Sequence, residues 1–190
     1  MKLPDGRTRC AWAENSEPER AYHDAEWGVP LHGDNALFEM LTLEGAQAGL
    51  SWRTVLVRRD LYREAYHGFD IAIVAAMTDC ELANLLTGSG LIRNRLKIHS
   101  VRKNAQAALR IIGEAGSLDA YLWSFVGGVP IRNFWRSRAE VPTQTDLSGR
   151  MSRELKRRGL SFVGSTICYA FMQATGMVND HAVDCFRHGV

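Results

Sequence analysis

The chain has 190 residues, 46% hydrophobic and 23% charged, which is ordinary for a globular protein with one well-buried core. Its formal net charge is only +2, so any contact with nucleic acid must come from local clusters of basic side chains. No apolar run approaches the length of about 18 residues that a membrane span needs, and residues 1–7 lack the apolar stretch of a secretory signal. We therefore expect a cytoplasmic protein whose four cysteines are free or metal-bound.

Helical patterns follow one another along the chain, and alternating strand patterns are nearly absent. Helices are expected from Asp34, as the cap, towards Gly49, from the cap Ser51 through Leu56, from Thr78 to Gly88, from Gly90 to Gly113, from Ser117 through Phe125, from Asp146 to Arg158 and from Ser165 to Thr175. The stretch from Pro130 to Ser148 is the longest connection and is expected to be mobile. The predicted fold class is all-α.

Cysteine and histidine residues near both ends of the chain form a candidate metal site. Cys10 and His23 lie near the N-terminus, and His181 and Cys185 lie near the C-terminus with an H-x3-C spacing. Two thiolates and two imidazoles suit a closed, structural Zn²⁺ site, which would join the termini. Either Asp24 or Asp180 is a candidate to orient a ligating imidazole. The alternative is two unrelated pairs, since the short zinc-finger spacing is absent.

A carboxylate interrupts an apolar helix face. Leu37, Leu41, Glu44 and Ala48 share one face of the first predicted helix, and Trp52 follows soon after. A buried acid beside a large aromatic side chain is typical of a pocket for a flat, cationic ring. The alternative is that Glu44 reaches water near the helix end.

Two glycines, Gly88 and Gly90, lie in a short turn near 86–92 between two predicted helices. Backbone amides in such a turn, together with the positive end of the next helix, can bind a phosphate. A set of basic residues follows within eleven positions: Arg93, Arg95, Lys97, Arg102 and Lys103. The set favours a DNA-facing edge, and the alternative is a plain helical hairpin with a solvated basic face.

Several stretches of the sequence resemble the type I 3-methyladenine DNA glycosylases of the helix-hairpin-helix superfamily. The matching stretches are residues 10–12 (CAW), 21–30 (AYHDAEWGVP), 37–40 (LFEM), 43–52 (LEGAQAGLSW), 90–93 (GLIR), 162–164 (FVG), 166–173 (TICYAFMQ) and 178–181 (VNDH). They lie in order over almost the whole chain. The resemblance implies a helix-hairpin-helix glycosylase fold with a zinc site joining the N- and C-terminal segments.

The resemblance also implies the roles of individual residues. The implied zinc ligands are Cys10, His23, His181 and Cys185, and the implied DNA-binding residues are Leu50, Gly88, Gly90, Arg93 and Arg95. Glu44 would recognise the methylated adenine, with Tyr22 and Trp52 stacking on the base. Leu50 would fill the gap left by the flipped nucleotide.

Two departures from the family pattern bear on these roles. Glu19 stands where family members often carry another aromatic residue, so a further stacking partner is in doubt. The turn near 86–92 is not the Leu-Pro-Gly-Val-Gly form of the wider superfamily. Many superfamily glycosylases keep a catalytic aspartate in the helix after the turn, whereas the first aspartate after the turn in this chain is Asp119, beyond that helix. The type I branch also lacks an aspartate in that helix. The resemblance therefore implies hydrolysis of an already weakened N-glycosidic bond, without a strong acid or a lysine nucleophile.

The resemblance finally implies an organisation and a set of partners. Residues 1–190 are expected to form a single catalytic unit, with 1–33 and 176–190 as zinc-joined termini and 34–175 as a helical body. The partners would be double-stranded DNA with an alkylated purine and free 3-methyladenine as product, for a monomer that does not bind membranes. The alternatives are a DNA-binding damage sensor without activity, a zinc-containing protein that binds a free purine, and a glycosylase with another alkylbase preference.

Overall fold

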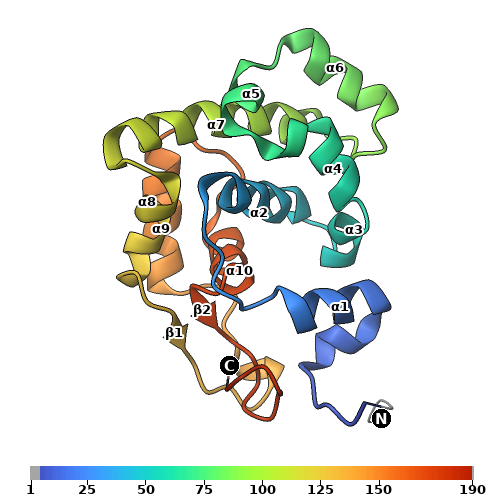
Figure 1. Ribbon diagram of the computed structural model, residues 1–190, viewed down its shortest axis with the longest axis vertical. Helices are drawn as coiled ribbons and strands as arrows, with labels where there is room; N and C mark the ends of the chain where they lie inside the picture. The colour runs from blue at the N-terminus through green and yellow to red at the C-terminus, as the bar shows by residue number, and fades with distance from the viewer. Residues whose placement is uncertain (1–4, 190) are drawn as a thin grey trace.

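The computed structural model describes residues 5–189, and its helices pack around one central helix, α2 (Figure 1). Residues 1–4 and 190 lie outside the described residues. Part of the stretch 1–7, expected to lack a secretory signal, and the outer ends of the expected segments 1–33 and 176–190 therefore lie outside them too. The helices are α1 (Glu17–Ala25), α2 (Asp34–Gln47), α3 (Trp52–Leu56), α4 (Arg59–Ala65), α5 (Ile71–Ala76), α6 (Asp79–Gly88), α7 (Arg95–Ala115), α8 (Leu118–Trp123), α9 (Asp146–Arg157) and α10 (Ser165–Ala174). Short 3₁₀-helices are η1 (Ala11–Asn15), η2 (His67–Phe69), η3 (Ser124–Val126) and η4 (Arg138–Glu140), and the strands are β1 (Ile131–Arg132) and β2 (Val178–Asn179).

Helix α2 lies at the centre because it is covered on every side. Leu37, Leu41 and Leu43 are at most 2% exposed, and the helix contacts α7, α10, α3 and α8. A helix buried all round belongs to the core of a protein. Polar side chains on α2 are therefore removed from water unless a cleft reaches them.

The helix boundaries confirm most of the predicted caps. The hydroxyl of Ser51 accepts the backbone N–H of Thr54 at the start of α3, and Thr78 forms the predicted capping box of α6. The prediction that Asp34 caps α2 is wrong. Gly33 is the N-cap, and the carboxylate of Asp34 instead accepts the backbone N–H of Asp119 at 2.9 Å, which ties α2 to α8.

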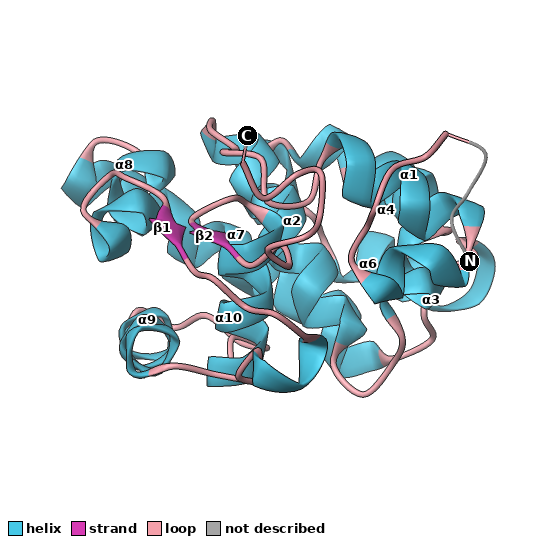
Figure 2. Cartoon of the chain, turned by 90° about the horizontal axis from the view of Figure 1, so that it is seen from below, coloured by secondary structure: helices cyan, strands magenta, loops and turns pink. Residues whose placement is uncertain are grey.

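A two-stranded parallel pairing of β1 with β2, drawn in magenta in Figure 2, was not predicted from the sequence. Ile131 pairs with Val178 and Arg132 with Asn179. Strands of two residues carry no alternating pattern, so periodicity could not reveal them. The pairing fastens the long connection after Pro130, expected to be mobile, to the C-terminal segment.

The N- and C-terminal segments lie beside each other (Figures 1 and 2). The backbone N–H of Phe186 donates to the carbonyl of Thr8 at 3.0 Å. The stretch 21–30 that carries the family resemblance begins on α1, which ends at Ala25, and continues into the turn after it. Among residues 5–189, each helix is too short or too polar to cross a membrane.

Gly176 supports a close backbone contact and provides the first testable prediction. Its φ is +69°, and a Cβ added there would lie 2.5 Å from the backbone nitrogen of Pro30. We expect Gly176→Ala to lower the free energy of unfolding by about 2–4 kcal/mol, measured by urea denaturation. Gly116→Ala is the matched control, since φ is +85° there and a Cβ would meet open space among the described residues. Equal effects of the two substitutions would show that the backbone contact contributes nothing.

Candidate functional site

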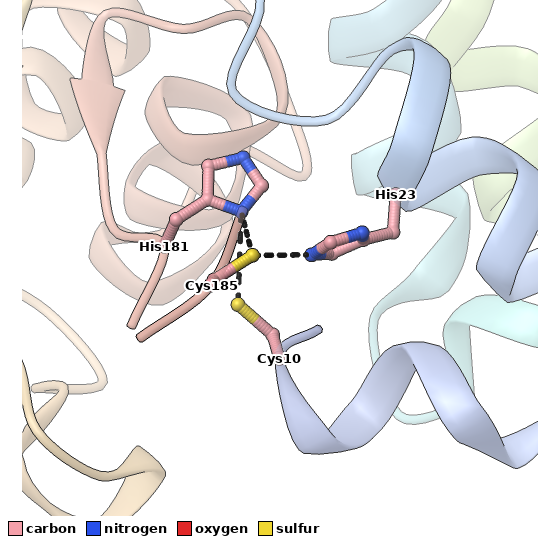
Figure 3. A group of neighbouring side chains, drawn as sticks. All are labelled: Cys10, His23, His181 and Cys185. Atoms are coloured by element: carbon pink, nitrogen blue, oxygen red, sulfur yellow. Dashed lines mark hydrogen bonds between the residues drawn. The ribbon is translucent and has the colours of Figure 1, made fainter. Parts of the chain in front are cut away.

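Four side chains from the two ends of the chain meet in a buried Cys/His cluster (Figure 3). Cys10 precedes η1, His23 lies in the last turn of α1, and His181 and Cys185 follow β2 in a turn. Their ligand atoms all lie within 4.8 Å of one another. The Sγ of Cys185 is 3.4 Å from Nε2 of His23 and 3.5 Å from Nδ1 of His181, and the Sγ of Cys10 is 3.6 Å from the same Nδ1.

These spacings fit a tetrahedral metal ion. Zinc–sulfur bonds of about 2.3 Å and zinc–nitrogen bonds of about 2.0–2.1 Å separate neighbouring sulfur and nitrogen ligands by about 3.6 Å. The measured sulfur–nitrogen distances lie close to that value. The cluster could therefore hold a metal ion, with two thiolates and two imidazoles filling its coordination sphere.

Each imidazole of the cluster is held through its other ring nitrogen. Nδ1 of His23 lies 2.8 Å from a carboxylate oxygen of Asp24, and Nε2 of His181 lies 3.0 Å from the carbonyl of Trp27. Acceptors at these positions favour the tautomer whose free nitrogen faces the sulfur atoms. Of the two candidates named from the sequence, Asp24 holds the orienting position, and Asp180 binds other groups.

A cleft of about 810 Å³ opens beside the cluster. Its walls come from η1, α1, the end of α2, the start of α3, α10 and the segment that follows β1. The volume suits a ligand the size of a nucleobase with part of its nucleotide. The structure brings together here four residues singled out from the sequence: Tyr22, Glu44, Leu50 and Trp52.

Glu44 is the buried acid of this cleft. It is 4% exposed, and its Oε2 has no hydrogen-bond partner within residues 5–189. Burial raises the pKa of Glu44 to about 8, because the carboxylate form loses its hydration. Burial therefore favours the protonated form of this carboxyl, and a cation that approaches it would favour the carboxylate.

A second buried acid on the same helix shows what Glu44 lacks. Glu39 accepts the guanidinium of Arg59 at 2.6 Å and that of Arg63 at 2.9 Å. Buried carboxylates in proteins normally have such partners. An acid buried without one, in a cleft, is a strong candidate for ligand recognition.

Tyr22 and Trp52 form an aromatic wall next to this acid. Their ring centroids lie 5.1 Å apart at an interplanar angle of 44°. Burial raises the pKa of Tyr22 well above its ordinary value, and the nearby charge of Glu44 raises it further. A ring placed between two aromatic planes needs a gap of about 7 Å. A flat ligand would therefore stack against this pair rather than between its members.

Trp12 completes the wall, although sequence reasoning gave it no role. Its ring lies 6.4 Å from that of Tyr22 and 5.4 Å from that of His23. It thus lies between the cleft and the Cys/His cluster. The available signal was its position two residues after Cys10.

Two further residues at the cleft differ in exposure. Leu50 follows α2, lines the cleft and is 41% exposed, so this apolar side chain lies at the mouth of the cleft. Glu19 lines the wall and is 8% exposed. Its carboxylate accepts the hydroxyl of Ser16 at 2.7 Å at the start of α1. The cleft wall thus carries a carboxylate at the position where family members often have a further aromatic ring.

The turn with two glycines joins α6 to α7, outside the cleft lining of the described residues. Gly90 needs its glycine, because φ is +69° and a Cβ would lie 3.0 Å from the Cδ1 of Leu61. Gly88 lies in the last turn of α6, and a Cβ there would meet open space among residues 5–189. Arg93 and Arg95 are exposed beside this turn.

The other three basic residues after the turn have partners within the protein, which the sequence did not predict. Lys97 donates to the carbonyls of Ala46 and Ala48 at 2.8 and 2.7 Å, and burial lowers its pKa. Arg102 binds Asp79, and Lys103 donates to Ser161. Lys97 therefore supports the C-terminal end of α2, close to Glu44.

Asp180 binds four side chains, whereas the sequence suggested it as a candidate to orient a ligating imidazole. Its two carboxylate oxygens accept four hydrogen bonds, and the residue is 3% exposed. The donors are the Nδ2 of Asn133 (2.7 Å), the indole N–H of Trp135 (2.8 Å), the hydroxyl of Tyr169 (2.6 Å) and the Nε2 of Gln173 (2.7 Å). Because Tyr169 and Gln173 line the cleft, this carboxylate fixes one of its walls.

The chain matches the methyladenine glycosylase family over residues 12–188. DNA-3-methyladenine glycosylase 1 of Escherichia coli (strain K12) is 46% identical over 177 residues, which cover 93% of this chain and 95% of that protein. A crystal structure of 3-methyladenine DNA glycosylase I has a TM-score of 0.92 at 46% identity and covers 95% of this chain and 100% of its own. A structure described as the basis of 3-methyladenine recognition by the Staphylococcus aureus 3-methyladenine DNA glycosylase I has a TM-score of 0.92 at 33% identity, covering 95% of this chain and 96% of its own. The chain therefore belongs to the methyladenine glycosylase family.

Proposed function

We propose that this protein excises 3-methyladenine from alkylated DNA by hydrolysing the N-glycosidic bond and leaving an abasic site, without cutting the strand. The observation that carries the proposal is the partnerless carboxyl of Glu44, buried beside Tyr22 and Trp52 in the cleft. A relative at 46% identity bears the name of this activity, and a structural neighbour is described by its recognition of 3-methyladenine.

Recognition depends on the charge of the damaged base. Methylation at N3 makes the purine cationic while it is attached to deoxyribose. The cationic base enters the cleft, Glu44 ionises and accepts hydrogen bonds from its amino edge, and the ring stacks on Tyr22 and Trp52. Normal adenine is neutral, so it neither ionises Glu44 nor gains cation–π attraction.

The chemical step needs little acid catalysis. The positive charge already weakens the bond between base and sugar, and the neutral base is a good leaving group. Water adds to the oxocarbenium-like sugar, while the cleft holds the leaving base. The lining of the cleft, as far as residues 5–189 describe it, contains no lysine for a covalent strand-cleaving step, which supports a monofunctional enzyme.

DNA binding involves the mouth of the cleft and the turn between α6 and α7. Leu50, exposed at the mouth, fills the space of the flipped nucleotide. The backbone around Gly88 and Gly90, with Arg93 and Arg95, binds phosphates as the hairpin of a helix-hairpin-helix element. The partners are thus alkylated double-stranded DNA and the free base. The protein acts as a monomer in the cytoplasm.

Zn²⁺ is the metal that the Cys/His cluster suits best, as a structural ion held by Cys10, His23, His181 and Cys185. Two sulfur and two nitrogen donors at tetrahedral spacing match the ligand preference of zinc. The ion would join residues 1–33 to 176–190 within one catalytic unit around the helical body 34–175. Bound there, it supplies cross-linking rather than catalysis.

Glu44→Gln tests the role of the carboxyl in excision. The amide keeps the size of the side chain but cannot become an anion, so a charge-assisted hydrogen bond of about 1.5–3 kcal/mol is lost. We expect release of 3-methyladenine from methylated DNA, followed by chromatography of the freed bases, to slow about 10- to 100-fold. Glu39→Gln is the matched control, because it changes a buried acid on the same helix outside the cleft lining. Unchanged excision by the folded Glu44→Gln variant would exclude this role.

The raised pKa of Glu44 predicts a pH dependence of stability. Its folded-state pKa of about 8 lies above the ordinary value of 4.5, so between these values the folded protein holds a proton that the unfolded chain releases. The stability of the natural protein must then fall with rising pH relative to Glu44→Gln, whose amide does not titrate. We expect the difference in free energy of unfolding to shift by about 2–5 kcal/mol between about pH 5 and pH 8.5, since one pKa unit equals about 1.4 kcal/mol. A pH-independent difference in urea denaturation would contradict the burial of an ionisable carboxyl.

Metal content tests the cluster. We expect about one zinc per purified chain by elemental analysis, as a closed four-ligand site requires. Cys185→Ser should lower that content and the unfolding temperature, because it leaves three ligands at the cluster. Cys168→Ser is the control, since this buried cysteine lies on α10 away from the cluster. A metal-free protein with unchanged stability would refute the structural role.

A further inference from the structure

One wall of the cleft is formed by a segment that we call the arm, residues 133–138, which follows β1. Trp135, Arg136 and Arg138 of the arm line the cleft together with Leu50 and Trp52, which come from a distant part of the sequence. The arm lies in the orange region between β1 and α9, in the lower part of Figure 1, whereas α3 lies higher in that view, above α1. Both arginines are exposed at the mouth.

The arm is held in place by several hydrogen bonds to the C-terminal segment. Asp180 accepts the side chains of Asn133 and Trp135, as described above. The carbonyl of Asn133 lies 2.9 Å from Nε2 of His188, and the carbonyl of Trp135 accepts the backbone N–H of Val183 at 2.9 Å. An exposed segment with this many fixed points presents its side chains at defined positions.

Acidic side chains line the floor of the cleft, and basic side chains lie at its mouth. The acids Glu19 and Glu44 are buried in the cleft, at 8% and 4% exposure, whereas Arg136 and Arg138 face water. Asp184 is the exposed carboxylate among the described lining residues, so the two guanidiniums exceed it. The carboxylate of Glu140 accepts the backbone N–H of Arg136 at 2.9 Å and thereby fixes the turn that carries both arginines.

We propose that the arm is a second DNA-backbone site, in which Arg136 and Arg138 bind phosphates of the damaged strand beside the flipped nucleotide. This inference rests on the proposed function, because a base can enter the cleft only if its own phosphates come to the mouth. Guanidinium groups bind phosphate oxygens with two parallel hydrogen bonds, which fixes position as well as charge. The strand is thus held at the arm on one side and at the α6–α7 turn on the other.

The test compares Arg136→Ala/Arg138→Ala with the natural protein on a duplex that carries a tetrahydrofuran abasic analogue. Binding is measured over a range of potassium chloride concentrations. Loss of two phosphate contacts should raise Kd about 10- to 100-fold at low salt and reduce the slope of log affinity against log salt by about 2. Arg132→Ala is the matched control, since Arg132 is an exposed arginine on β1 outside the described cleft lining.

Binding of free 3-methyladenine, measured by calorimetry, separates this inference from the proposed function. The double variant should bind the free base as the natural protein does, because its substitutions lie at the mouth. An unchanged Kd and salt slope for the duplex, or an equal change in Arg132→Ala, would overturn the arm site while leaving base excision intact. Failure of the natural protein to release 3-methyladenine would instead overturn the proposed function, and a weakened duplex affinity of the double variant would still support the arm as a DNA site.

Discussion

The burial of one carboxyl without a partner shapes the rest of this site. Glu44 lies on the central helix, where neighbouring packing fixes the backbone, and its side chain is 4% exposed. An isolated carboxylate in such surroundings costs several kcal/mol, and protonation is the cheaper state. The helix tolerates this because its other faces are fully packed and Lys97 binds the carbonyls of Ala46 and Ala48 at its end. Stability in the core thus permits an unfavourable group at the cleft.

The Cys/His cluster and the cleft share their walls, so the two ends of the chain define the ligand site together. Trp12 contacts both His23 and Tyr22, and Tyr22 contacts Trp52. Tyr22 and His23 are neighbours on α1, facing the cleft and the cluster. Asp180, next to His181, fixes Tyr169, Gln173 and Trp135 on another wall. A metal ion bound by the cluster would therefore also set the spacing of the aromatic wall.

The sequence predicted which residues form this site better than it predicted the contacts those residues make. The phase of Glu44 on an apolar helix face and the chemistry of two cysteines and two histidines depend on side-chain identity, which the sequence displays directly. The internal partners of Lys97 and Arg102 were not predicted, because charge alone does not show that these side chains bind backbone carbonyl groups. The β1–β2 pairing and the four bonds of Asp180 join residues from distant parts of the chain through contacts without periodicity. Such contacts follow from tertiary packing, which local patterns do not encode.

A pKa near 8 suits Glu44 to distinguish cationic from neutral purines under the proposed function. Because this pKa lies close to neutral pH, ionising the carboxyl at pH 7 has only a small cost. Attraction to a cationic ring at contact distance in a dry cleft exceeds that cost, so a methylated purine meets a carboxylate. A neutral adenine gives no such gain and meets a carboxylic acid, which offers one accepting oxygen and one donating hydroxyl instead of two charged accepting oxygens. The same side chain therefore changes its hydrogen-bonding character with the charge of the base, and selectivity arises from a proton rather than from shape alone.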